Sequence, residues 1–208
     1  MKNFYTNALT LYGQIDEVVE MHYNTHKKKP PCAKGCASCC SQFFEISELE
    51  FLLISEAIDA LPSEKRNALA SRAQTLFSLF KDNWPSFYSD FFTPNTINLL
   101  TDDYYEHPQR FKVVIPCVFL SNEGLCEIYE RRPLTCRTTG VGFQQLINFG
   151  AVCNYIKIGI TTPLWQADLR PLRPSIDEIR WLTDPDHPEL FKRQYPMFYY
   201  VYDMFYND

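Results

Sequence analysis

The chain has 208 residues, a length that fits one domain or one domain with an appendage. Its 20 Lys and Arg residues against 25 Asp and Glu residues give a formal net charge of −5, which argues against a nucleic-acid partner. Hydrophobic residues make up 46% of the chain and charged residues 22%, as in folded proteins, and the common glycine-rich nucleotide-binding motifs do not occur.

Three helices are predicted in the first part of the chain. Residues 4–26 carry apolar side chains every three or four positions, and the lysines and prolines at 27–31 are typical of a helix end. A second helix is predicted to begin at Ser47, because Ser47 and Glu50 match the capping box. A third is predicted over residues 63–84, with its apolar side chains facing inward.

The middle of the chain predicts a β-hairpin. Residues 111–120 are rich in β-branched and aromatic side chains, with Pro116 at an edge or bulge position. Residues 121–124 form a turn that ends on the glycine such a turn needs. Residues 125–129 are then expected to pair back as a short second strand. A short helix over residues 95–105 is expected just before the hairpin.

The C-terminal segment, residues 163–208, is rich in proline and aromatic residues. Residues 175–178 match the capping box of a short helix. The aromatic end, residues 195–206, is expected to form a helix that packs its rings on the core. The predicted fold class is therefore α+β and mainly helical, as a single domain over residues 1–208. Its helices pack on a small irregular cysteine-rich subdomain with one β-hairpin.

The eight cysteines are the most informative feature of the composition. No apolar run approaches the ~20 residues of a membrane span, and residues 1–20 lack the features of a signal peptide. We therefore expect a cytoplasmic protein with no membrane partner. Structural disulfides are rare in that reducing compartment, so the number of cysteines favours metal ligation by thiolates.

Half of the cysteines lie in one short loop with the pattern C-x3-C-x2-C-C, at Cys32, Cys36, Cys39 and Cys40. Spacers of two or three residues let two sulfur atoms converge on one zinc ion or on one edge of an iron–sulfur cluster. Gly35 supplies the backbone freedom that such a loop needs. The adjacent Cys39 and Cys40 point to opposite sides of an extended backbone, so both reach one centre only where the backbone turns.

The remaining cysteines are Cys117, Cys126, Cys136 and Cys153. The first two flank the predicted hairpin turn, which would bring them together. Cys136 lies among three arginines, namely Arg131, Arg132 and Arg137. These could offset the negative charge of a thiolate site and donate hydrogen bonds to sulfur, and Arg137 is the best candidate. Alternatively, the arginines form surface salt bridges with Glu127 or Glu130.

Three linked elements carry a resemblance to a known family. They are residues 36–40 (CASCC), residues 117–129 (CVFLSNEGLCEIY) and residues 132–137 (RPLTCR). In this order they resemble the YkgJ-type cysteine-cluster proteins, which are described as zinc- or iron-chelating. The resemblance covers a cysteine-cluster core at about residues 32–153. It implies binding of zinc or iron, and because some relatives are called flagellin lysine N-methylases, it also raises a methylation role.

Other interpretations of these residues remain open. The spacing C-x3-C-x2-C also occurs in radical S-adenosylmethionine enzymes, but their barrel needs repeated strand–helix units and only one good strand is predicted here. Buried thiols without metal are the alternative for all eight cysteines, and most of all for Cys153 in its apolar run. His22 and His26 have chelating spacing, although the end of a helix favours histidine without a metal. His107 and His187 are expected to be exposed.

We therefore expect metal binding through cysteines, and the ligand candidates are Cys32, Cys36, Cys39, Cys40, Cys117, Cys126, Cys136 and Cys153. This number exceeds the four thiolates of one structural zinc ion, so a second ion or an iron–sulfur cluster is implied. Three function classes follow. They are a structural or storage site for zinc or iron, an iron–sulfur enzyme such as a protein lysine N-methylase, and a zinc-stabilised module that binds a protein partner.

Overall fold

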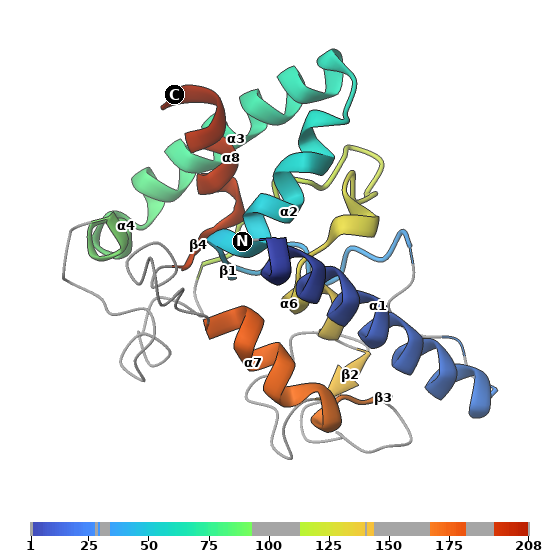
Figure 1. Cartoon of the computed structure of the whole chain (residues 1–208). Helices are drawn as coiled ribbons and strands as arrows, with labels where there is room; N and C mark the ends of the chain where they lie inside the picture. The colour runs from blue at the N-terminus through green and yellow to red at the C-terminus, as the bar shows by residue number, and fades with distance from the viewer. Residues whose placement is uncertain are drawn as a thin grey trace. The chain divides into compact units, whose positions relative to one another are not determined.

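The computed structural model describes residues 2–27, 29, 34–92, 113–139, 141–143, 167–181 and 194–207. Seven α-helices lie within these ranges, which confirms the mainly helical prediction (Figure 1). The chain divides into two compact units, each built from two separated stretches. The first unit comprises residues 1–39 and 121–180, and the second comprises residues 40–120 and 181–208. The predicted single domain stays a prediction.

Helix α1 (Lys2–Thr25) is the longest element of the first unit and confirms the predicted N-terminal helix. Its buried side chains recur at the spacing of one helical face, and they are Ala8, Leu11, Tyr12, Ile15 and Tyr23. This face lies against α6 (Leu134–Thr138) and β3 (Ala167–Asp168). Hydrophobic burial therefore joins the start of the chain to the segment that contains Cys136.

Short elements complete the first unit. They are η2 (Tyr129–Arg131), β2 (Gly142–Phe143), which pairs in parallel with β3, η3 (Arg170–Leu172) and α7 (Arg173–Trp181). The short helix predicted at residues 175–178 is confirmed, but its predicted capping box is wrong, because α7 begins before Ser175. The chain already turns at η3, where an Asp168 carboxylate oxygen accepts from the backbone N–H of Arg170 at 3.0 Å. Arg173 and Asp177 then form an ion pair one turn apart.

The second unit contains the predicted second and third helices, α2 (Glu48–Asp59) and α3 (Ser63–Asn83). The capping box at the start of α2 is confirmed. Ser47 Oγ accepts from the N–H of Glu50 at 3.3 Å, and Glu50 Oε2 accepts from the N–H of Ser47 at 3.4 Å. Just before it, β1 (Glu45–Ser47) pairs antiparallel with β4 (Gln194–Pro196). Sequence patterns did not predict this pair, because three-residue strands have too little periodicity.

The core of the second unit is aromatic. Helix α8 (Met197–Tyr206) packs along α3, as Figure 1 shows, and α4 (Pro85–Phe92) follows α3. The rings of Phe43 and Phe80 stack 5.3 Å apart, and Phe87 and Phe198 surround them. The prediction that the aromatic C-terminal helix packs on the core is therefore confirmed. The predicted helix at residues 95–105 lies outside the described residues.

The two strands of the predicted β-hairpin do not form within residues 113–120 or 125–129, where only Val114, Leu120 and Cys126 have single-residue bridge conformation. Val114 instead makes an isolated antiparallel bridge with Gln42, and the N–H of Ile115 donates to the carbonyl of Ser41 at 3.2 Å. The segment thus pairs with the end of the cysteine loop, and it tolerates Pro116 because the N–H groups that donate are those of Ile115 and Cys117 on either side.

The turn within that segment is confirmed. Gly124 has a φ of +75°, its N–H donates to the carbonyl of Ser121 at 3.0 Å, and the N–H of Ser121 donates to Leu125 at 2.8 Å. Sequence therefore located the turn correctly and the strands around it incorrectly.

Candidate metal centre

Six of the eight cysteines lie within the described residues, all reduced and half-buried. Cys32 and Cys153 lie outside them. The first unit contains Cys36, Cys39, Cys126 and Cys136, and the second contains Cys40 and Cys117. Thiols that are half-buried are accessible to an ion while being partly shielded from water.

In the first unit, the cysteine loop lies beside the segment around Cys126. A Cβ atom added at Gly35 would lie 3.7 Å from Leu125 Cδ2, and Lys34 Nζ lies 5.9 Å from the centre of the Tyr129 ring. Gly35 has a φ of +99°, a backbone conformation that favours glycine. The Cys36 thiol donates to Ser38 Oγ at 3.8 Å, within the same loop. The loop and the Cys126 segment are therefore neighbours, as a shared site requires.

The electrostatic surroundings of Cys126 combine opposing effects. Burial is the largest and raises the pKa of the thiol, and the negative charge of Glu127 adds to this. A hydrogen bond from the backbone of Ile128 and the positive charge of Arg132 act in the opposite direction, because both stabilise the thiolate. Amide and guanidinium donors around a ligand sulfur are the outer contacts that orient and tune thiolate metal sites.

Cys136 lies on α6 next to Arg137, whose side chain is only 4% exposed. The guanidinium of Arg137 donates to the carbonyls of Arg132 at 2.9 Å and Glu130 at 2.6 Å, and to the carboxylate of Asp16. Its centre also lies 4.5 Å above the ring of Tyr12. The structure therefore places Arg137 in a buried network with α1. Its contact with Glu130 is to the backbone, not the carboxylate.

In the second unit, the backbone N–H of Cys117 donates to the carbonyl of Cys40 at 2.6 Å. The next carbonyl, that of Val118, accepts from Arg72 Nη1 of α3 at 2.5 Å. The end of the cysteine loop and Cys117 are thus held side by side by their backbones.

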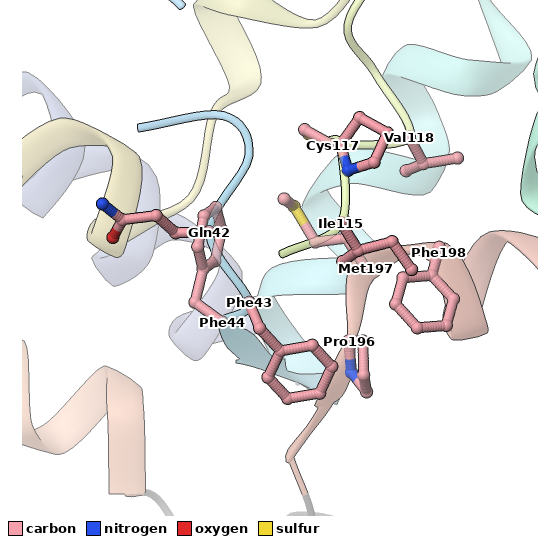
Figure 2. A pocket seen from close by; sticks show the side chains of 10 residues that line it. Gln42, Phe43, Phe44, Ile115, Cys117, Val118, Pro196, Met197 and Phe198 are labelled. Carbon is pink, nitrogen blue, oxygen red and sulfur yellow. The ribbon is translucent and has the colours of Figure 1, made fainter. Parts of the chain in front are cut away.

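A pocket of about 20 Å³ adjoins Cys117, and its walls come from residues 42–44, 115–118 and 196–198 (Figure 2). A void needs roughly 10–15 Å³ of this measure to hold a single water molecule. The pocket therefore has room for a water molecule beside Cys117.

The two histidines of α1 stand close together. The rings of His22 and His26 are 4.5 Å apart, and His26 Nδ1 lies 2.8 Å from the carbonyl oxygen of His22. This backbone contact lies at the end of the helix, and the metal-free interpretation of the pair stays a prediction. His107 and His187 lie outside the described residues.

Within the described ranges, no three or more His, Cys, Asp or Glu side chains form a group arranged to hold a metal ion. The donor chemistry nevertheless fits a thiophilic metal, since cysteine sulfur is the ligand that zinc and iron–sulfur centres select. Two of the eight candidate ligands, Cys32 and Cys153, lie outside these ranges.

Sequence reasoning missed Asp16, Tyr12 and Tyr129, which surround the arginines near Cys136. Asp16 occurs in the polar part of an ordinary amphipathic pattern, and nothing in its spacing distinguishes it from Glu17. Only the packing of α1 against α6 brings it to Arg132 and Arg137.

These features define a cysteine-rich domain whose donors suit zinc or iron. A family model confirms the resemblance noted from the motifs, matching residues 31–154. The chain therefore belongs to the CxxCxxCC family, described as a "putative zinc- or iron-chelating domain". No curated protein and no solved structure matches the chain. None of the helices in the described ranges has the length and apolar character needed to cross a membrane.

Proposed function

We propose that this chain binds zinc or iron through cysteine thiolates and that Cys36, Cys39, Cys126 and Cys136 form its principal ligand set. All four belong to the first unit, and four thiolates are the ligand number of a closed structural zinc site. The observation that carries the proposal is the contact between the cysteine loop and the Cys126 segment, through Gly35 and Leu125.

Further thiolates extend the proposal. Cys40 and Cys117 of the second unit lie on backbones joined by a hydrogen bond, and Cys32 and Cys153 complete the set of eight. This surplus over four supports either a second ion or an iron–sulfur cluster. Anaerobic purification followed by metal analysis and an absorption spectrum distinguishes the two, because zinc–thiolate sites are colourless and iron–sulfur clusters absorb visible light.

Methyl transfer is not part of the proposal. It stays an alternative that the family resemblance raises, and none of the contacts described above carries it. A binding or structural role for the metal requires no substrate pocket. Among the three classes raised from the sequence, metal chelation is therefore the one that the described residues support best.

The experiment that tests the proposal replaces single ligands. Cys39→Ser and Cys136→Ser should each lower the bound metal per chain and the thermal unfolding midpoint together, since metal binding stabilises only the folded state. Thr135→Ser, next to Cys136 on α6, is the matched control and should retain both. Unchanged metal content in both cysteine variants would refute the proposed ligand set.

A further inference from the structure

Asp16 of α1 bridges the two arginines that flank the candidate ligands. Its Oδ1 accepts from Arg132 Nη2 at 3.2 Å, and its Oδ2 accepts from Arg137 Nη1. One carboxylate therefore uses each of its oxygens for a different guanidinium. Asp16 lies outside residues 31–154, the part of the chain that defines the family.

Aromatic rings and backbone carbonyls also contact the guanidinium groups of Arg132 and Arg137. Arg132 lies 4.1 Å above the ring of Tyr129 and donates to the carbonyl of that residue at 3.1 Å. Arg137 stacks on the ring of Tyr12 and binds two backbone carbonyls of the loop that precedes α6. The loop thus folds around Arg137, and Asp16 supplies the carboxylate that faces this buried charge.

The two arginines are linked to two different candidate ligands. Arg137 is the neighbour of Cys136 on α6, so its anchoring sets where this short helix lies. Arg132 is close enough for its positive charge to act on the sulfur of Cys126. Loss of Asp16 would remove the carboxylate contact of both guanidinium groups at once, although Asp16 itself touches no cysteine in the contacts described above.

We infer that Asp16 is a positioning residue for the metal centre, holding Arg132 and Arg137 so that Cys126 and Cys136 are oriented for metal binding. The inference rests on the proposed function. Its physical basis is that residues one step removed from the ligands fix ligand orientation, and their loss typically weakens metal affinity about 10–100-fold. Asp16 would exert this effect from a helix that contributes no cysteine to the proposed site.

The test uses Co²⁺ as a spectroscopic probe in the full chain, with Asp16→Asn as the variant. Asp16→Asn keeps the shape of the side chain and removes the charge. Cobalt affinity, measured by competition with a chelator, should fall about tenfold or more, and the thiolate-to-cobalt absorption should change in intensity. Glu17→Gln, at the adjacent exposed position on α1, makes the same change of charge. Its cobalt affinity and absorption should equal those of the wild type.

A second variant separates positioning from folding. Arg132→Lys keeps the positive charge but lacks the planar fork that binds Asp16 and stacks on Tyr129. It should also weaken cobalt binding while the helix content of the metal-free chain stays unchanged. Wild-type cobalt affinity in either folded variant would overturn the inference alone. A wild-type chain with no thiolate-to-cobalt absorption would instead overturn the proposed function and, with it, the role of Asp16.

Discussion

The backbone N–H of Cys117 donates to the carbonyl oxygen of Cys40 at a distance of 2.6 Å. This hydrogen bond joins two cysteine motifs that lie far apart in the sequence. Beside it, the N–H of Ile115 donates to Ser41, so the chain around Pro116 runs along the end of the cysteine loop. Proximity of these two motifs therefore comes from main-chain pairing and does not require a metal ligand.

Arg72 should be important for this arrangement, because its guanidinium binds the carbonyl of Val118, next to Cys117. Hydrogen bonds to charged groups contribute about 1.5–3 kcal/mol, and Arg72→Met should lower the free energy of unfolding by about that amount. Arg66→Met on the same helix removes an exposed ion pair with Asp59 and should cost less than ~1 kcal/mol. Urea unfolding measures both, and equal losses would refute the role of Arg72.

Gly35 in the cysteine loop should not tolerate a side chain. Its φ of +99° is strained for other residues, so Gly35→Ala should lower the free energy of unfolding by about 1–2 kcal/mol and weaken metal binding. Gly13→Ala provides the opposite case, because Gly13 lies within α1 and a Cβ atom added there would meet no other atom within 4 Å. That change should stabilise the chain by roughly 0.5–1 kcal/mol. Denaturant unfolding measures the free energy of unfolding of both variants. An unchanged free energy for Gly35→Ala would contradict the strained backbone at Gly35.

The N-terminal cap of α2 should account for a measurable share of stability. Ser47→Ala removes the hydroxyl that accepts from the N–H of Glu50 and should cost about 1 kcal/mol. Ser55→Ala, in the middle of the same helix, replaces a residue of lower helix propensity and should be neutral or slightly stabilising. Thermal unfolding compares the two variants, and the prediction fails if their midpoints coincide.

Glu48 should make stability depend on pH. Burial, and then the negative charge of Asp203, raise the pKa of Glu48 above its ordinary value of 4.5. The folded chain holds this proton more tightly than the unfolded chain, so the contribution of Glu48 to stability is present in acid. It is lost as the pH rises from about 4.5 through the higher folded pKa.

The variant Glu48→Gln removes this titration. The wild type should therefore lose unfolding free energy relative to Glu48→Gln between acid and neutral pH, as urea unfolding at several pH values would reveal. Ser55→Ala introduces no change in charge, so its difference from the wild type should stay constant over the same range. A constant difference for Glu48→Gln as well would refute the prediction.

Local patterns predicted the elements whose interactions lie within a few residues. The period of apolar side chains located α1 and α3, and the pairing of Ser47 with Glu50 located the start of α2. The cysteine motifs predicted the family, which the match over residues 31–154 confirms. These predictions are correct because helix caps, amphipathic faces and short ligand spacings each depend only on residues close together in the sequence.

The elements that failed depend on distant partners. Residues 111–120 were predicted to pair with residues 125–129, and Val114 and Ile115 instead pair with Gln42 and Ser41. β-branched composition indicates that a segment can pair, but the partner is chosen by packing elsewhere in the chain. The short helix α4 was missed for a related reason, since its aromatic rings pack against rings of α3 and α8.

The sequence by itself determined that this chain is helical, rich in candidate thiolate ligands and a member of the CxxCxxCC family. The tertiary structure alone decided that Asp16 meets Arg132 and Arg137, and that Cys117 lies against Cys40. The physical reason is that ligand type and spacing are local properties. The contacts of a charged side chain or a backbone amide with distant residues depend instead on packing. They form only when apolar faces far apart in the sequence are buried together.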